Sequence, residues 1–306
     1  MAEPNFFIIG AQKCGTTALH HAMSQHPEIF LSRKKEPFFF AMDGKVPNCW
    51  TVSKMNFKWL VYKWDDYLRL FEGVKNEKAI GEASAIYLSS YYPERTAARI
   101  RKRIPHARII ALIRQPSERA YSAFNYYHAR NLEPLSDFEM ALSCEKERIE
   151  QDGIPDIRHF SNGLYYKNLK PYFDFFPRNQ IRVYLFEDWL NNSGAVLEDA
   201  FHFLGVDETV KVTVQQLNVG HGFRSRLLRK ILLRPNLQPS RFGRLLGLFP
   251  GHINDRMTKW NRMALPGLCP HLRQLLNIRY RDDLTKLQTL IERDLSAWIS
   301  PLFIDN

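Results

Sequence analysis

Residues Gly10 to Thr17 read GAQKCGTT and combine two glycines with a lysine, a cysteine and two threonines. The spacing of Gly10 and Gly15 is that of an ATP-type P-loop, G-x-x-x-x-G-K-[ST], in which the lysine directly follows the second glycine. Here Thr16 and Thr17 follow Gly15, and the lysine, Lys13, lies inside the loop. The loop therefore predicts binding of a phosphate-like anion, but not in the manner of an ATP site.

A strand and a helix are needed to position this loop. The apolar residues Phe6 to Ile9 precede it and suit a buried parallel strand, and TTALHHAM after Gly15 can continue as a helix. Backbone N–H groups of residues 13–17 would then converge at a helix N-terminus, where the macrodipole also favours an anion. The alternative is a glycine-containing turn that holds no ligand.

A second polar group follows the strongest buried strand, RIIALI, which ends in Arg114. P-loop NTPases use an aspartate in such a place to help hold Mg²⁺. A cation there predicts a site that binds an anion directly, without a metal ion. Ser122 lies eight positions later on a helix that begins near Pro116, and such a pair can hold one more phosphate. The alternative is an ordinary ion pair between Arg114 and Glu118.

Strand-like and helical stretches alternate along the chain, which is typical of an α/β fold with a mainly parallel sheet. We expect strands at 5–9, 78–82, 107–113 and 180–186. We expect helices at 16–25, 93–103, 116–130, 136–150, 163–175, 193–204 and about 279–298. From 205 to 278 prolines interrupt the pattern. The predicted fold is P-loop-like, with three layers: a central mainly parallel sheet flanked by helices.

Bulk composition narrows the class of protein. With 306 residues, 45% of them apolar, we expect one domain over 1–306. No apolar run approaches the roughly 18 residues that span a bilayer, and strand-like sequence starts by Asn5, so we expect no signal peptide. Four scattered cysteines without C-x-x-C spacing argue against a zinc site and a disulfide framework. A cytoplasmic protein without a metal is the expectation.

Two irregular segments stand out. Residues 42–64 hold three tryptophans and several lysines, and could form a substrate lid because aromatic faces hold sugars, lipids or bases. An ordinary loop packed on the core is the alternative. Residues 220–262 carry ten Lys or Arg against a single acid, in a chain with a net charge of +11. Such a segment can meet an anionic cofactor, a polyanionic substrate, nucleic acid or a membrane, or simply keep the protein soluble.

Three segments in order, FFIIGAQKCGTTAL, IRQPSERAYSAF and NVGHGFRSRLL, resemble the cofactor-binding segments of sulfotransferases that use 3′-phosphoadenosine-5′-phosphosulfate (PAPS). The resemblance is closest to the bacterial and heparan-sulfate sulfotransferase-like branches and covers residues 5–225 in segments. It implies transfer of a sulfuryl group from PAPS to a hydroxyl or amine, without a metal ion. The acceptor stays open among a saccharide, a lipid and a small molecule.

Carried over residue by residue, the resemblance assigns the cofactor-binding positions. The 5′-phosphosulfate loop is Lys13, Cys14, Gly15, Thr16 and Thr17. Arg114 and Ser122 match the pair that holds the 3′-phosphate. A late loop that closes over the nucleotide corresponds to His221, Gly222, Phe223, Arg224 and Ser225, so the basic segment 220–278 would cover the cofactor and acceptor sites. Lys13 would reach the oxygen between phosphorus and sulfur and stabilise the leaving phosphate.

The candidate base is Glu36 in KKEPFFF, because an attacking hydroxyl or amine needs a base within reach, and a glutamate matches this position in heparan-sulfate enzymes. Its alternative is a surface ion pair with Lys34 or Lys35. His20 and His21, on the helix after the loop, are alternative bases. The other candidates on the substrate side are Phe38, Phe39, Glu82 and Ser84.

The chain departs from the family pattern at two positions. Phe38 stands where bacterial relatives often have a histidine, so a Glu–His pair is unavailable. Ala83 stands where heparan-sulfate enzymes have a lysine, which weakens the expectation of a heparan-like polyanion.

Three other functions are alternatives for this sequence. A P-loop kinase would need a lysine after Gly15 and an acid for Mg²⁺. Nucleic-acid binding is suggested by the pI of about 9.5 and would weaken steeply with salt, but we do not expect it. Peripheral contact with an anionic membrane through 224–262 is compatible with catalysis.

Overall fold

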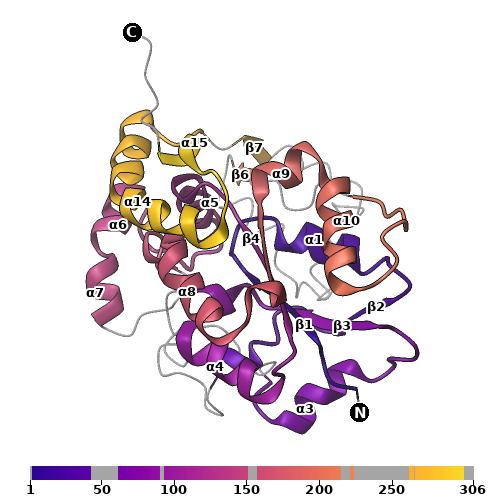
Figure 1. Ribbon diagram of the computed structural model, residues 1–306. Coiled ribbons are helices and arrows are strands. Elements are labelled where there is room, and N and C mark those ends of the chain that lie inside the picture. Colours follow the sequence, from indigo (N-terminus) through magenta and orange to yellow (C-terminus); the bar gives the residue numbers. More distant parts are fainter. Residues whose placement is uncertain are drawn as a thin grey trace, which may run out of the picture.

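The computed structural model describes residues 2–42, 61–89, 93–150, 157–214, 221–223, 262–264 and 266–299. Five strands form a central sheet in the order β2-β3-β1-β4-β5 (Figure 1). Every neighbouring pair is parallel, so the carboxyl ends of the strands meet at one edge. The strands are β1 (Phe6–Gly10), β2 (Ile29–Leu31), β3 (Ala79–Ala83), β4 (Arg108–Ile113) and β5 (Ile181–Leu185).

Helices cover both faces of the sheet, as right-handed crossovers between parallel strands require. α1 (Thr16–Met23) and α10 (Ser193–Leu204) lie on one face, while α4 (Pro93–Arg103) and α8 (Tyr165–Phe175) pack together on the other (Figure 1). The central strands β1 and β4 are buried almost throughout, and for that reason both are nearly continuous apolar runs.

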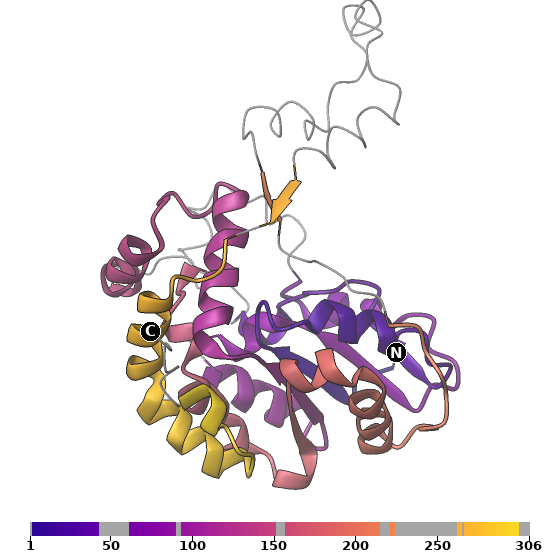
Figure 2. The same ribbon diagram turned by 90° about the horizontal axis from the view of Figure 1, so that it is seen from above.

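Further elements complete the described part of the fold. The other helices within the described ranges are α3 (Trp64–Leu68), α5 (Pro116–Ala129), α6 (Phe138–Ser143), α7 (Glu145–Glu150), α9 (Phe186–Asn191), α14 (Pro270–Ile291) and α15 (Ser296–Ile299). The 3₁₀ turns are η1 (Phe39–Ala41), η2 (Arg69–Phe71), η3 (Ala85–Leu88), η5 (Ser161–Gly163) and η6 (Arg178–Gln180). An antiparallel ribbon of β6 (His221–Phe223) and β7 (Arg262–Ala264) stands beside α5 (Figure 2).

The predicted fold class is confirmed, and four of the five strands of the parallel sheet were expected within a residue or two. Two helices were predicted with wrong bounds. The helix expected over 136–150 is interrupted at Cys144, where the chain turns and carries Glu145 inward onto the N–H groups of Phe160 and Ser161. The last long helix begins at Pro270, not near 279, because a proline fits the first helical position, and it ends at Ile291, not near 298.

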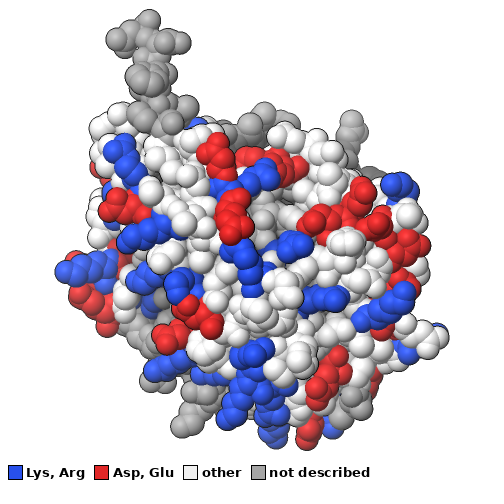
Figure 3. Space-filling model, in the orientation of Figure 1, with Lys and Arg blue, Asp and Glu red and all other residues white. Residues whose placement is uncertain are grey.

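Helix α4 has few apolar residues and is strongly basic. Glu94 lies in its first turn, and Arg101, Lys102 and Arg103 lie in its last, so these charges complement the macrodipole. In Figure 3, Lys and Arg side chains gather at the lower edge of the molecule, where α4 lies. Within the described ranges, no helix combines the length and apolar character needed to cross a membrane.

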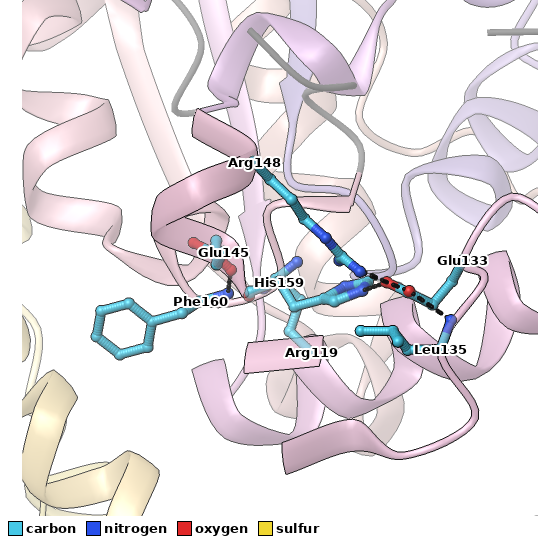
Figure 4. Close-up of polar contacts among 7 residues, drawn as sticks. All are labelled: Arg119, Glu133, Leu135, Glu145, Arg148, His159 and Phe160. Carbon is cyan, nitrogen blue, oxygen red and sulfur yellow. Dashed lines mark hydrogen bonds and ion pairs between the residues drawn. The ribbon is translucent and has the colours of Figure 1, made fainter. Parts of the chain in front are cut away.

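A buried acid fixes the chain just after α5. The Glu133 carboxylate accepts hydrogen bonds from Arg148 Nη1 at 2.7 Å and Nη2 at 2.8 Å, and its Oε2 lies 2.8 Å from His159 Nε2 (Figure 4). Burial alone would raise the pKa of Glu133, but the contacts with His159 and Arg148 hold it at about 2. This cluster anchors the end of the helix that carries Arg130, a residue of the site described next.

Candidate active site

The loop between β1 and α1 contains two residues in the left-handed region. Lys13 has a φ of 66° and Gly15, directly before α1, a φ of 89°. A Cβ at Gly15 would lie 2.8 Å from Phe186 Cε2, so both the backbone angle and the packing require glycine. No described side chain caps α1, and its first turn contains no acid. The start of the helix is therefore open to an anion.

Lys13 lies among other cations. Its Nζ is 4.0 Å from the centroid of the Tyr126 ring, and the Arg130 guanidinium is 3.5 Å from the same centroid. Burial, together with the positive charges of Arg130, Arg114 and Lys35, lowers the pKa of Lys13 to about 8. A group of cations drawn together in this way favours an anionic ligand, which would relieve their mutual repulsion.

Arg114 directly follows β4, the neighbour of β1, so it lies at the same sheet edge as the Lys13 loop. Its guanidinium lies 5.2 Å from the centroid of the Phe186 ring. Its Nη2 lies 3.6 Å from Glu118 Oε2, so the expected alternative ion pair is present, at a distance too long for a hydrogen bond. Arg114 thus keeps donors for another anion.

Tyr165 ties the two loops together. Its hydroxyl donates to the carbonyl oxygen of Arg114 at 2.8 Å and lies 3.7 Å from Cys14 Sγ. Cys14 is fully buried, and burial raises the pKa of its thiol to about 11. Its side chain therefore points into the core, so only its backbone is placed where the predicted contact with the cofactor could form.

Ser122 lies on the face of α5 that is turned toward both Arg114 and Lys13. It lies one helical turn from Glu118, which faces Arg114, and one turn from Tyr126, which faces Lys13. Ser122 is half-buried. The structure thus brings Lys13, Arg114 and Ser122 to one region, with β6 beside α5. Arg224 and Ser225 lie outside the described residues.

Glu36 lies on the segment that crosses the same sheet edge after β2. Its Oε1 is 2.8 Å from Lys35 Nζ, and its Oε2 accepts the Ala85 N–H at 2.8 Å. The expected pair with Lys35 therefore exists, but the Glu36 side chain keeps 27% of its surface exposed. The positive charge of Lys35, the neighbour of Glu36 in sequence, also contributes to the lowered pKa of Lys13. The role of Glu36 as the base stays a prediction.

His20 is the weaker alternative. Burial, and then the charges of Lys35 and His21, lower its pKa to about 4. A neutral imidazole with such a low pKa is a poor proton acceptor at neutral pH.

Phe39, three residues after Glu36, belongs to a cluster of aromatic rings. Its ring stacks on Tyr67 with centroids 4.5 Å apart, and the centroid of the Trp64 ring lies 5.4 Å from that of Tyr67 and 5.6 Å from that of Phe39. Phe38 is half-buried and has a φ of 61°. Trp64 belongs to the expected lid 42–64, but 43–60 lies outside the described residues.

Glu82 and Ser84 are both fully buried at the end of β3. Glu82 accepts hydrogen bonds from the hydroxyls of Tyr67, Tyr87 and Ser84. Burial raises its pKa to about 7, although the three hydroxyls partly offset this. Direct contact of these two side chains with a substrate stays a prediction, and the structure favours an indirect role.

Sequence reasoning missed several residues of the site: Lys35, Tyr126, Arg130 and Tyr165. One of them could have been found, because Tyr126 follows Ser122 by four residues on a predicted helix and therefore shares its face. Tyr165 carried no local signal, since it contacts Arg114 and Cys14 only through the tertiary fold.

A sulfotransferase family model matches residues 4–209, about two thirds of the chain. The chain belongs to the sulfotransferase family. The predicted resemblance is thereby confirmed, and the kinase alternative is wrong, as the lysine position and the strand-end arginine had indicated. The matched range contains all the described candidate site residues except His221, Gly222 and Phe223.

Known sulfotransferases resemble this one to different extents. Human carbohydrate sulfotransferase 15 is 27% identical over 257 residues, covering 66% of this chain and 44% of the relative. Human bifunctional heparan sulfate N-deacetylase/N-sulfotransferase 2 is 23% identical over 213 residues, covering 69% and 23%. This sulfotransferase spans less than half the length of these relatives. The crystal structure of a sulfotransferase from Alicyclobacillus acidocaldarius matches with a TM-score of 0.75 and 31% identity, covering 98% of this chain and 100% of that one.

Proposed function

We propose that this sulfotransferase moves a sulfuryl group from PAPS to a hydroxyl or amine of a saccharide acceptor, without a metal ion. One observation carries the proposal: Lys13 and Arg114 follow neighbouring parallel strands and lie against the same face of α5, on either side of Ser122. Two cationic positions at one sheet edge suit a donor with anionic groups at both ends.

The donor, when bound, supplies a sulfuryl group whose departure leaves negative charge on a phosphate oxygen. Lys13 and the start of α1 would hold the 5′-phosphosulfate, and the open helix N-terminus fits such a group. Arg114 and Ser122 would hold the 3′-phosphate. The role of Lys13 is to balance the charge that develops on the leaving oxygen. Glu36 accepts the proton of the attacking hydroxyl or amine.

A saccharide is the favoured acceptor class. Two relatives are named for carbohydrate and heparan sulfate substrates. In the aromatic cluster Tyr67 is fully buried, but the half-buried rings of Phe39 and Trp64 are of the kind on which sugars stack. Ala83 removes a cation that the heparan-sulfate enzymes have, so we expect an acceptor of low charge near the reacting group.

The test is calorimetry with 3′,5′-adenosine bisphosphate, ADP and ATP, each with and without EDTA. We expect the 3′-phosphorylated nucleotide to bind most tightly and EDTA to have no effect. Equal affinity for all three nucleotides, or loss of binding in EDTA, would refute the donor assignment. Transfer of labelled sulfate from PAPS to desulfated heparan oligosaccharides then tests the acceptor class.

A further inference from the structure

Glu82 is a fully buried acid beside the site, and the proposed chemistry does not use it. It forms no ion pair with any residue in the described ranges. Its Oε1 accepts from the hydroxyls of Tyr67 at 2.8 Å and Tyr87 at 2.7 Å, and its Oε2 from Ser84 Oγ at 2.7 Å. A buried charge balanced only by neutral donors contributes little to stability. Its presence beside a catalytic segment therefore points to a positioning role.

The charge on Glu82 fixes the direction of the hydrogen bonds around it. Each hydroxyl has one proton to donate, and Ser84 and Tyr87 both give theirs to Glu82. Their remaining lone pairs accept backbone N–H groups, with Phe38 N at 3.3 Å from Ser84 Oγ and Phe40 N at 3.1 Å from the Tyr87 oxygen. The carboxylate thus acts on segment 36–40 through two hydroxyls.

Segment 36–40 depends on these contacts. Glu36 and Phe38 both have left-handed φ angles, 60° and 61°, which non-glycine residues seldom adopt. The N–H of Glu36 donates to the carbonyl of Ala83 at 2.9 Å, so residues 36, 38 and 40 each dock on the chain just after β3. The Ala85 N–H, which donates to Glu36 Oε2, and Arg99, which donates to the carbonyl of Phe40, also help to hold this unfavourable backbone, so we expect it to loosen when the contacts with Ser84 and Tyr87 change.

We propose that Glu82 is a positioning residue: through Ser84 and Tyr87 its carboxylate holds segment 36–40 and thereby the direction of the Glu36 side chain. The inference deepens the proposed function, because it rests on Glu36 as the base. When Glu82 is protonated, one of its oxygens carries the proton, so the carboxyl group accepts fewer hydrogen bonds and must donate one. One neighbouring hydroxyl then has to donate its proton elsewhere. The lone pair of that hydroxyl is no longer held toward the N–H of Phe38 or Phe40.

The arrangement makes the segment sensitive to pH near neutrality. Burial raises the pKa of Glu82 to about 7. The groups that face it are the hydroxyls of Tyr67, Ser84 and Tyr87, the nearby Tyr172 and the carboxylate of Glu36. Because the pKa of Glu82 is about 7, we expect the segment to be held above that pH and loosened below it.

Hydrogen exchange of the Phe38 and Phe40 amides, corrected for intrinsic rates, is the direct measurement. In the unaltered protein we expect protection of both amides to fall as the pH is lowered through about 7. In Glu82→Gln we expect roughly tenfold lower protection at pH 8 and no pH step, because the amide group competes for the hydroxyl lone pairs. Unchanged protection in Glu82→Gln would overturn the proposal.

Two smaller changes test the same hydroxyls without altering the charge. Ser84→Ala should expose the Phe38 amide alone, and Tyr87→Phe should expose the Phe40 amide alone. These variants test the two hydroxyl contacts even if Glu82→Gln does not fold. Glu145→Gln is the matched control, since Glu145 is a buried acid that also accepts from a serine hydroxyl, Ser161, and from backbone N–H groups. It should keep the unaltered pH step. Loss of the step in Glu145→Gln would contradict a specific role for Glu82.

The experiment separates this inference from the proposed function. With desulfated heparan oligosaccharides as acceptors, Glu82→Gln should lower kcat while affinity for 3′,5′-adenosine bisphosphate is unchanged. Failure of the unaltered protein to prefer that nucleotide would refute the donor assignment but not the exchange result. Normal exchange behaviour with a normal kcat in Glu82→Gln would refute the positioning role alone.

Discussion

Around Lys13 and Arg114, the site consists of cations that extend from short turns after β1 and β4. Around Glu36, it consists of a segment with two left-handed residues, docked on a buried acid through neutral hydroxyls. The first region is set mainly by the ends of adjacent parallel strands, with Tyr165 linking the two turns. The second has no strand or long helix of its own, so its geometry depends on side chains that are distant in sequence.

This difference predicts different failures. A substitution on the donor side, at Lys13 or Arg114, should remove charge and leave the geometry intact. On the acceptor side, a change of Glu36 itself should remove the base, whereas a change of Glu82, Ser84 or Tyr87 should alter the geometry of segment 36–40.

The largest effect is expected from Lys13→Ala. Removing the ammonium leaves the charge on the departing phosphate unbalanced, so turnover with PAPS should fall about 10²–10³-fold. Far-ultraviolet circular dichroism and the melting temperature should stay unchanged, because the loop conformation is set by Gly15 and the flanking elements. Lys170→Ala, which removes a lysine on α8 paired with Asp174, is the control and should keep full activity. A fully active Lys13→Ala protein would refute the assigned mechanism.

Glu36→Gln should come next, with a rate lowered about 10²-fold. The glutamine oxygen can still accept the Ala85 N–H, so the change removes the base with little change in geometry. Affinity for 3′,5′-adenosine bisphosphate should be the same as before. A normal rate at every pH would show that the base is elsewhere, and His20→Gln would then be the next variant.

Arg114→Ala should chiefly weaken nucleotide binding. Losing a charge-assisted contact to the 3′-phosphate costs about 1.5–3 kcal/mol, or roughly 10–100-fold in affinity. Calorimetry should show this loss for 3′,5′-adenosine bisphosphate and almost none for AMP, which lacks the 3′-phosphate. Arg178→Ala, on η6 and paired with Glu292, is the matched control. Equal losses for both nucleotides would place Arg114 elsewhere in the site.

The positions of Lys13, Arg114 and Ser122 in the fold could be predicted because the information that sets them is local, while their contact with the donor stays a prediction. A strand, a glycine-bounded turn and a helix fix the positions of Lys13 and Thr17, and the end of a buried strand fixes that of Arg114. The acceptor side was predicted only as single residues. Nothing near Glu36 in sequence indicates that Ser84 and Tyr87 hold it, or that both turn their protons to Glu82. The three-residue strand β2 was missed because it is too short to show a period.

The basic segment 224–262 and a cytoplasmic location stay predictions. Residues 224–261 lie outside the described part of the chain, so the possible membrane contact rests on composition alone. The surface that is described adds a second basic region on α4.

Lys13 also gives the donor side a pH dependence. Burial and nearby cations lower its pKa to about 8, so in the free protein it is protonated below that pH and neutral above it. Affinity for 3′,5′-adenosine bisphosphate should therefore fall about tenfold between pH 7 and pH 9. Lys13→Arg should abolish the fall, because arginine stays charged over this range. Affinity that rises with pH would contradict the placement of Lys13 at the anion.

The smallest effect is expected from Ser122→Ala, which removes one hydroxyl from the face of α5 between Lys13 and Arg114. A single hydroxyl hydrogen bond to a charged phosphate is worth about 1.5 kcal/mol at the lower end of its range, so nucleotide affinity should fall roughly tenfold. If Ser122 and Arg114 hold the same phosphate, the loss should shrink in the Arg114→Ala background, because two groups that share a ligand atom are not independent. Calorimetry on the four proteins of this double-mutant cycle measures the coupling directly. Full additivity would mean that the two side chains contact different groups of the nucleotide. The proposal that Arg114 and Ser122 together hold the 3′-phosphate would then be wrong.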